Sequence, residues 1–330
     1  MSKERITRRQ FSTAAVAAAG TLVMPRFARA QQNYPNRPVR FVLPFAPAGV
    51  ADITARVAAE KLGDKLGQRF VVENQPGPGG IAAARAVLSQ PADGYTIGLV
   101  TNGTSISVAI YNHLPFDPVK EFACISTIGY FELVFCTNPE SEFKTLQDFI
   151  KAARAQPGKL NVGTTNVGGT QNLAAELFKS SAGLNFQIVP YRSTPEVIVA
   201  TLRNDVQLMV DFYAPLKGSL TDKKLRPLAA TGPKRSPFMP DVPTVAEAGG
   251  FGYEVTSWNG IFAPAATPAL VLALLNKTVH EIVALPDVKQ RYADLGIEAK
   301  ASTHEQLKAR LEDDIKKWAA VIKTAGIPKQ

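Results

Sequence analysis

The chain has few cysteines and few histidines. Among its 330 residues there are two cysteines and three histidines. Cys124 and Cys136 lie in apolar, strand-like runs. A chain of this length has a core large enough to be stable without a disulfide, so we expect two buried thiols. A disulfide formed in an oxidising compartment is the alternative. His113, His280 and His304 lie far apart and away from the cysteines, which argues against a metal site with the usual ligand spacing.

The common catalytic motifs are also missing. The sequence contains no G-x-S-x-G elbow, no H-E-x-x-H, no P-loop and no pair of carboxylates on a shared face. The segment Glu73–Ala82 (ENQPGPGGIA) superficially fits a dinucleotide fingerprint, but Pro76 and Pro78 lack the N–H groups that bind a pyrophosphate. We therefore predict no enzyme activity and no cofactor, and interpret the segment as a rigid turn that rims a ligand cleft. An enzyme with a nucleotide cofactor at this turn is kept as an alternative.

The excess of positive charge is small once the N-terminal segment is set aside. The chain has 37 basic and 28 acidic residues, a net charge of +9, and residues 1–30 hold six of the basic and one of the acidic residues. The remainder has 31 basic residues against 27 acidic ones, or about +4. It contains no long lysine or arginine run and no interleaving of basic and aromatic residues, so nucleic acid is not expected as a partner.

The N-terminal segment has the features of an export signal. A basic stretch from Lys3 to Arg9 precedes the apolar run Ala14–Met24, which is too short to span a bilayer, and Ala28–Ala30 follows as a small-x-small cleavage site. Thr7–Phe11 (TRRQF) adds the twin-arginine pattern. We predict a twin-arginine signal peptide over residues 1–30, cleavage before Gln31, and a mature protein in the periplasm.

Beyond the signal, the sequence alternates β-rich runs with helical ones, which predicts an α/β fold with parallel sheet covered by helices. The predicted strands are Val39–Phe45, Phe70–Glu73, Thr96–Thr101, Leu133–Thr137, Lys159–Gly163, Phe186–Val189, Val206–Asp211 and Arg226–Ala230. The predicted helices are Ala51–Leu66, Ile81–Leu88, Thr145–Ala155, Thr170–Ser181, Pro195–Arg203, Pro268–Leu285, Asp287–Asp294 and Ser302–Ala325.

The length of the chain predicts two α/β domains, because a single core rarely grows this large. We expect the chain to cross between them near Phe131–Val134 and Val255–Ile261. Ser302 and Glu305, three residues apart, predict a capping box at the start of the last helix.

The junction Val42–Arg56 (VLPFAPAGVADITAR) leads from a strand through small residues into a helix. The first N–H groups of that helix have no partner within the helix, and together with the helix dipole they favour an anion. Asp52 and Arg56 are four residues apart and are predicted to pair along the helix as scaffold. A plain strand-to-helix turn at the sheet edge is the equally weighted alternative.

A second junction, Asn161–Asn172 (NVGTTNVGGTQN), has the same design. Thr164, Thr165, Asn166 and Thr170 supply neutral hydrogen-bond donors. The alternative is an Asn/Gly turn with Thr170 as the N-cap of the helix that follows, and the two roles of Thr170 are compatible. Two such helix starts, one in each presumed lobe, predict a small acidic ligand held between them. Asp211, at the end of a strand and followed by two aromatic residues, is a further candidate, with a strand-terminal cap as its alternative role.

These segments also resemble a known family. The mature chain resembles the Bug-type, or TctC-like, receptors of tripartite tricarboxylate transporters over nearly its whole length. The matching segments, in the order of that family, are YPNRPVRFVLPFAPAGVADITAR, VVENQPGPGG, ADGYTIG, LPFDPVKEF, VGTTNVGGTQNLAAELF, VPYRSTPE, KRSPFMPDVPTVAEAGGFGYEVTSWNGIFAPAATP and KKWAAVIKTAGIP.

The resemblance implies a type II periplasmic binding protein with two α/β lobes and a ligand cleft between them. Residues 31–132 and 256–330 would form lobe 1, and residues 133–255 lobe 2. It further implies a receptor that delivers an organic carboxylate, a mono- or dicarboxylate with an aliphatic or aromatic skeleton, to membrane permease subunits. We expect a monomer. A sensing module that signals to a membrane kinase has the same pocket and is the alternative.

Carried over residue by residue, the resemblance implies ligand contacts from both junctions, much of them through backbone N–H groups and water. The ligand-binding residues predicted are Phe45, Ala46, Pro47, Ala48, Gly49, Val50, Ala51, Asp52, Thr164, Thr165, Asn166, Gly168, Gly169, Thr170, Gln171 and Asp211. The chain departs from the family at Ala48, where glycine is usual, at Gly169, where a hydroxyl is lost, and at Asn172, where histidine is usual. These departures leave the identity of the carboxylate open.

Overall fold

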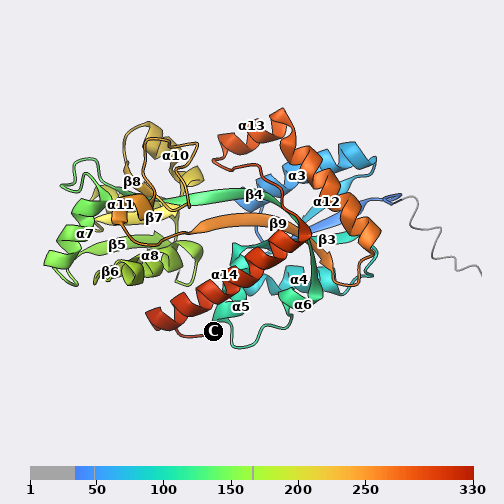
Figure 1. The fold of residues 1–330 in the computed structure, drawn as a ribbon, viewed down its shortest axis with the longest axis horizontal. Coiled ribbons are helices and arrows are strands. Elements are labelled where there is room, and N and C mark those ends of the chain that lie inside the picture. The colour runs from blue at the N-terminus through green and yellow to red at the C-terminus, as the bar shows by residue number, and fades with distance from the viewer. Residues whose placement is uncertain (1–33, 48, 166) are drawn as a thin grey trace, which may run out of the picture.

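The computed structural model describes residues 34–47, 49–165 and 167–330. The predicted export signal, residues 1–30, and two predicted site residues, Ala48 and Asn166, lie outside the described residues. The described chain forms two α/β lobes side by side, connected by long strands and by one helix that runs along both (Figure 1). The two-lobe α/β architecture predicted from the sequence is thus confirmed.

The first lobe is built on strands in the order β2-β1-β3-β9-β4. β1 runs parallel to β2 and β3, whereas β9 runs antiparallel to β3 and β4. The strands are β1 (Val39–Leu43), β2 (Phe70–Asn74), β3 (Thr96–Thr101), β4 (Phe122–Thr137) and β9 (Thr256–Pro264). The helices are α3 (Val50–Leu66), η2 (Pro78–Gly80), α4 (Ile81–Leu88), α5 (Asn102–Ile110), α6 (Pro118–Glu121), α12 (Ala269–Ala284) and α13 (Pro286–Asp294).

The sheet of this lobe is buried on both faces. Phe41 and Leu43 of β1 pack in one core with α3 and α12, while Val42 packs in another with α4 and Phe262 of β9. Alternate residues of a strand point to opposite faces, so a strand buried on both sides becomes a continuous apolar run. This is why VRFVL, apolar at every position except Arg40, forms an interior strand that leads into the first loop.

The second lobe has β4, β7, β5 and β6 in that order, with β8 also paired to β4. β5 runs parallel to β6 and β7, and β4 runs antiparallel to β7 and β8. The strands are β5 (Asn161–Thr165), β6 (Gln187–Tyr191), β7 (Leu208–Phe212) and β8 (Arg226–Ala230). The helices are α7 (Leu146–Ala155), α8 (Thr170–Ser181), α9 (Thr194–Leu202), α10 (Tyr213–Thr221) and α11 (Val245–Gly249).

β4 belongs to both sheets. Over Phe122–Glu132 it pairs with β9, and from Leu133 onwards it pairs with β7 and β8. The change of partner between Glu132 and Leu133 therefore marks the junction of the two sheets, and Figure 1 shows β4 and β9 running together through it.

The last helix, α14 (His304–Ala325), contacts both lobes. Leu307 and Leu311 pack in the core that contains α4, whereas Trp318 packs among the apolar residues of the second lobe. The predicted capping box is wrong: Thr303, not Ser302, is the N-cap, and its hydroxyl accepts from the Gln306 amide. The Ser302 hydroxyl is used elsewhere, because it accepts from the Thr127 amide of β4 at 2.9 Å.

Both cysteines are free and buried, as predicted. Burial raises the pKa of the Cys124 thiol to about 12 and raises the pKa of Cys136 as well. Within residues 34–330, with the gaps named above, no single helix has the length and hydropathy to cross a membrane. The bent pair α12 and α13, at 72°, meets that test by length and composition only.

Candidate functional site

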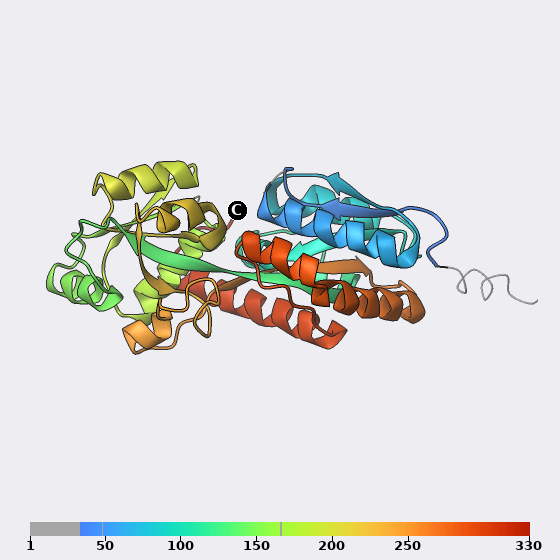
Figure 2. The ribbon, with the colours of Figure 1, turned by 90° about the horizontal axis from the view of Figure 1, so that it is seen from above.

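The first loop, residues 44–49, connects β1 to α3. The N-cap of α3 is Gly49, with φ −78° and ψ 167°, and no side chain caps the helix. The free N–H groups of the first turn therefore have no acceptor from a capping side chain. Viewed from above, α3 lies with its start toward the second lobe (Figure 2).

A polar cluster under this loop fixes its shape. The predicted pair is confirmed: the Asp52 carboxylate, 2% exposed, accepts from Arg56 Nε at 2.9 Å. Its other oxygen accepts from Asn74 Nδ2 at 2.8 Å, and the same nitrogen donates to the Phe45 carbonyl at 3.0 Å. Asp52 and Asn74 thus tie the loop to the start of α3 and to the end of β2.

The second loop, residues 166–169, connects β5 to α8 in the same way. The N-cap of α8 is Gly169, with φ −76° and ψ 166°, and again no side chain caps the helix. The alternative reading, with Thr170 as the N-cap, is wrong, because Thr170 is the first residue inside the helix. The Gly168 amide donates to Asn172 Oδ1 at 3.0 Å, which pins the loop to the first turn of α8.

Two threonine hydroxyls of the second junction are suited to donate hydrogen bonds. Thr164 is fully buried at the end of β5, and its Oγ1 has no hydrogen-bond partner among the described residues. Thr170 Oγ1 accepts from Asn102 Nδ2 at 3.1 Å, so the hydroxyl proton remains for another acceptor. Asn102 is itself held by Trp318 Nε1, which donates to its Oδ1 at 2.7 Å.

Asn102 is a residue that the sequence reasoning missed. It is fully buried at the start of α5, and it joins the first lobe to α8 and to α14. The available signal was its position directly after the buried strand Thr96–Thr101, because the ends of parallel strands are where ligands bind in α/β sheets.

Asp211 connects the starts of three helices. It is 1% exposed, and its carboxylate accepts from Gln171 Nε2 of α8 at 2.9 Å, from Thr194 Oγ1 of α9 at 2.6 Å and from the Phe212 amide before α10 at 2.7 Å. Burial raises the pKa of Asp211, while these hydrogen bonds oppose the shift by favouring the ionised form. The structure thus brings together two predicted site residues, Asp211 and Gln171, that lie forty positions apart.

The proline–glycine turn lies between the two loops. Gly80 approaches Pro44, the first residue of the first loop, so closely that an added Cβ would lie 3.3 Å from the Pro44 Cβ. Pro78 and Gly79 line a cavity of about 450 Å³ together with Gly103 of α5 and the segment Val167–Thr170 of the second loop. The turn therefore rims the space beside the second loop, as its sequence predicted.

The chemistry of both loops is neutral. Residues 44–51 and 164–172 contain no lysine or arginine, so backbone N–H groups, hydroxyls and amides are the donors that they offer. Among the described residues no cluster of histidine, cysteine and carboxylate groups has the arrangement of a metal site. Phe45 and Val167 add partly exposed apolar surface at the tips of the two loops.

Comparisons with known proteins agree on one family and fold. The model of the tripartite tricarboxylate transporter family receptor (TctC) matches residues 54–327. BugT of Bordetella pertussis is 30% identical over 296 residues, which cover 89% of this chain and 91% of BugT. A structure of an R. palustris protein with adipate is 32% identical, with a TM-score of 0.76, and covers 90% of this chain and 100% of that one. MatC from Rhodopseudomonas palustris with bound malate is 28% identical, with a TM-score of 0.72, and covers 88% and 100%.

Proposed function

We propose that this chain, which belongs to the tripartite tricarboxylate transporter family of receptors, captures an organic carboxylate for the permease subunits of such a transporter. The observation that carries the proposal is the pair of uncapped helix starts at Gly49 and Gly169, whose φ and ψ angles agree within a few degrees. Each start offers backbone N–H groups and the positive end of a helix dipole to an anion. The class we propose is a mono- or dicarboxylate, and the structures with adipate and malate, both dicarboxylates, support the second of these.

In this proposal the roles of the predicted site residues divide into two groups. The backbone of residues 45–51 and 168–170, with the hydroxyls of Thr164, Thr165 and Thr170, contacts the ligand. Asp52, Gln171 and Asp211 hold the loops in place through the hydrogen bonds described above. Ala48 and Asn166 complete the two loops as predicted contacts.

Capture proceeds by closure of the lobes without chemistry. The lobes, residues 31–132 with 256–330 and residues 133–255, admit the solute when open, and a ligand that contacts both loops favours the closed arrangement by its higher affinity for it. The closed face is then recognised by the permease. The protein acts as a periplasmic monomer, exported by its twin-arginine signal, and needs no cofactor.

A thermal-shift and calorimetric screen of residues 31–330 tests the proposal. The panel contains adipate, malate, an aromatic monocarboxylate and the neutral diamide of adipate. A true ligand present at about 100 times its dissociation constant adds about 2.7 kcal/mol to the free energy of unfolding. We expect a shift with at least one acid and none with the diamide. A shift with the neutral diamide and with none of the acids would overturn the proposal.

A further inference from the structure

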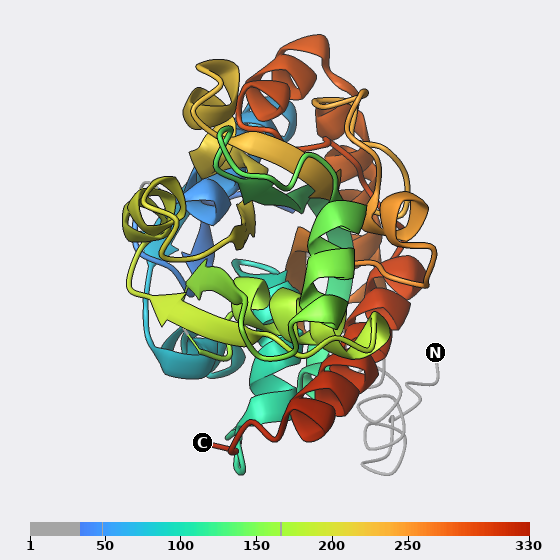
Figure 3. The same ribbon diagram turned by 90° about the vertical axis from the view of Figure 1, so that its left-hand side faces the viewer.

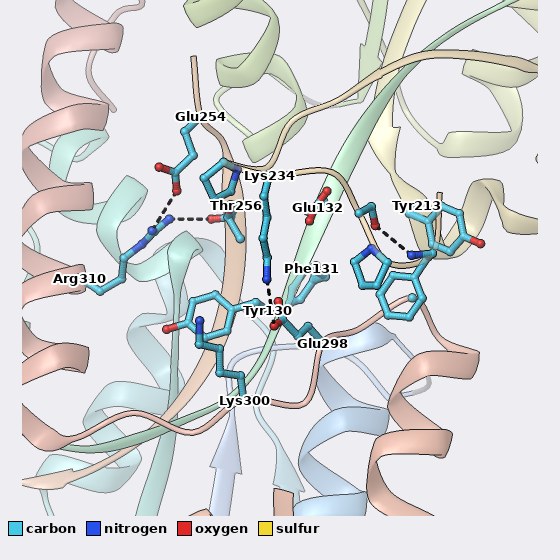
Figure 4. Close-up of a pocket in the computed structure, with 15 residues that line it drawn as sticks. Tyr130, Phe131, Glu132, Tyr213, Lys234, Glu254, Thr256, Glu298, Lys300 and Arg310 are labelled. Atoms are coloured by element: carbon cyan, nitrogen blue, oxygen red, sulfur yellow. Dashed lines mark hydrogen bonds and ion pairs between the residues drawn. The ribbon is translucent and has the colours of Figure 1, made fainter. Parts of the chain in front are cut away.

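A second cavity, of about 220 Å³, lies at the junction of the two sheets. Its walls come from β4, from Thr256 of β9 and Glu254 just before it, from the segments 233–238 and 296–300, and from α14. Figure 4 shows these walls converging from both sides of β4, with Lys234 reaching down toward Glu298. The cavity therefore depends on elements of both lobes.

Two polar side chains face this cavity without a protein partner. Glu132 of β4 and Thr256 of β9 are direct partners in the antiparallel ladder, so their side chains lie on the same face. Thr256 is 7% exposed, and neither its Oγ1 nor Glu132 Oε2, both buried, has a hydrogen-bond partner among the described residues. Buried polar atoms in folded proteins nearly always have a hydrogen-bond partner, so we expect these two atoms to bind a group from outside the described chain.

The position of the Glu132 carboxylate is fixed by Gly232. A Cβ added at Gly232 would lie 2.6 Å from the carboxyl carbon of Glu132 and less than 3 Å from both of its oxygens. The carboxylate thus packs directly against the backbone of residue 232, and any larger side chain there would displace it. The acceptor is part of the wall and not a mobile surface group.

The neighbouring charges have partners of their own. Lys234 Nζ lies 3.9 Å from Glu298 Oε1, and Arg310 lies 3.2 Å from Glu254. Lys300 Nζ lies over the Tyr130 ring, 5.5 Å from its centroid. The Lys300–Tyr130 contact shows that an ammonium group packs against an aromatic ring at the rim of the cavity.

The lining favours a cationic donor over an anion. Glu298 is paired with Lys234 and Glu254 with Arg310, which leaves Glu132 as the carboxylate of the lining without an ion pair among the described residues. Its charge repels an anion, and Glu132 Oε2 and Thr256 Oγ1, on residues paired across the ladder, are acceptors for N–H groups. The rings of Tyr213 and Phe238, stacked at 5.9 Å between centroids, provide an apolar wall for an alkyl group. We propose that this hinge cavity binds a small molecule through its primary ammonium group, held by Glu132 and Thr256.

The proposal implies proton release on binding. Burial, with the negative charge of Glu298, raises the pKa of Glu132 to about 7, and Lys234 acts in the opposite direction. The other charged groups that line the cavity, Glu254, Lys300 and Arg310, keep the partners named above. A bound ammonium favours the ionised carboxylate, so affinity rises by about tenfold from pH 6 to pH 8 and levels off above that.

The test is calorimetric titration of residues 31–330 with n-butylammonium chloride at pH 7.5. We expect saturable binding that Glu132→Gln weakens by at least about tenfold, because the acceptor loses its negative charge and the ion pair becomes a hydrogen bond to a neutral amide oxygen. Glu142→Gln, which changes the charge equally at an exposed position, should leave the affinity unchanged. Repeating the titration in two buffers of different ionisation enthalpy measures the released proton.

Three further probes make the result decisive. Tetramethylammonium, which has no N–H donor, and 1-butanol, which has no charge, should bind much more weakly than n-butylammonium. Thr256→Val retains every charge and should also weaken binding, which keeps the proposal testable even if Glu132→Gln does not fold. Absence of saturable binding to the unmodified protein would mean that ordered water alone occupies the cavity, and equal affinity in Glu132→Gln would mean that the ammonium binds elsewhere. Either result would overturn the proposal.

Discussion

The first and second loops share a backbone design but are supported differently. Gly49 and Gly169 have nearly identical φ and ψ angles, and each precedes a helix without a capping side chain. Under the first loop lies a charged cluster in which Arg56 and Asn74 both bind Asp52. Near the second loop the supporting hydrogen bonds come from neutral groups: Gln171 and Thr194 donate to the carboxylate of Asp211. The buried Thr164 hydroxyl lies at the same junction and has no partner among the described residues.

This difference suggests separate roles for the two loops: the first would bind the anion, and the second would discriminate between anions. Under the proposed function, the described part of the first loop offers backbone donors and apolar side chains, a combination expected to accept any carboxylate. The second loop adds hydroxyls at fixed positions, and such groups discriminate between ligands that can and cannot accept their hydrogen bonds. We therefore expect the second loop to tolerate change less well than the first.

The largest effect is expected from Gly168→Ala in the second loop. Gly168 has φ +76°, and an added Cβ would lie 2.6 Å from Ile110 Cδ1. We expect the free energy of unfolding to fall by about 1–3 kcal/mol, measured by urea denaturation, and the affinity for the best acid of the screen to fall about tenfold or more. Gly49→Ala is the matched change in the first loop.

The two controls separate strain from crowding. Gly49 has φ −78° and no neighbouring atom nearer than 4.0 Å to an added Cβ, so alanine should be tolerated there. Gly183 has φ +60° with open space around it, so Gly183→Ala reports the backbone strain alone. An equal loss of stability and affinity in Gly49→Ala and Gly168→Ala would contradict the asymmetry between the loops.

A smaller effect is expected from Asn74→Ala, which loosens the support of the first loop. The variant loses the hydrogen bonds from Nδ2 to Asp52 and to the Phe45 carbonyl. We expect the free energy of unfolding to fall by about 1–2 kcal/mol. The affinity should fall by the same factor for every acid tested, because Asn74 supports the shape of the loop and does not itself distinguish one acid from another. Asn138→Ala, which removes a comparable exposed bond to the Leu202 carbonyl, should leave affinity unchanged. A change in the ranking of acids by Asn74→Ala would argue against a generic first loop.

Removing single hydroxyls from the second junction should change affinity by about 1 kcal/mol, or about fivefold. Thr164→Val is expected to weaken carboxylate binding while leaving or raising stability, since its buried hydroxyl has no partner to lose. Thr170→Val should weaken binding as well. Thr201→Val, whose hydroxyl donates to the Val197 carbonyl at 2.8 Å, should lose stability without any change in binding. Unchanged affinity in both Thr164→Val and Thr170→Val would exclude these hydroxyls as donors.

The smallest effect is expected from salt. Neither loop contains lysine or arginine, so no pair of full opposite charges forms when a carboxylate binds. We expect the dissociation constant to rise by less than about threefold between 0.05 and 0.5 M sodium chloride, measured by titration. A much steeper dependence would indicate that a cation from elsewhere in the chain reaches the ligand.

The features of the site that were predicted from sequence are those with a local signal. Both junctions combine a buried strand with a loop of small residues and an amphipathic helix, and the first helix was predicted to start within one residue of the observed Val50. The contact between Asp211 and Gln171 has no local signal, because it depends on the parallel pairing of β5 and β7. The same holds for Asn102, whose partners are Thr170 and Trp318.

Some elements were missed because tertiary context overrides local preference. α5 has the sequence NGTSISVAI, rich in glycine, β-branched residues and serine, and none of these favours a helix. It forms because the Thr101 and Thr104 side chains cap it and because Ile106 and Ile110 are buried against α14 and the second lobe. β4 was predicted only from Leu133 because its first half, Phe122–Glu132, depends on pairing with β9.

The shared use of α14 has a consequence for how the protein unfolds. Seen from the end of the second lobe, α14 runs beside α5 and past the strands of that lobe (Figure 3). Trp318 and Ile322 complete the core of the second lobe, together with Ile106 and Ile110 of α5, although all four belong to segments of the first. The second lobe therefore has no self-contained core, whereas the clusters under the first sheet are built from first-lobe segments alone. The two should lose their structure in one cooperative transition, and residues 133–255 expressed alone should not fold, because the surface that these side chains cover would be exposed to water.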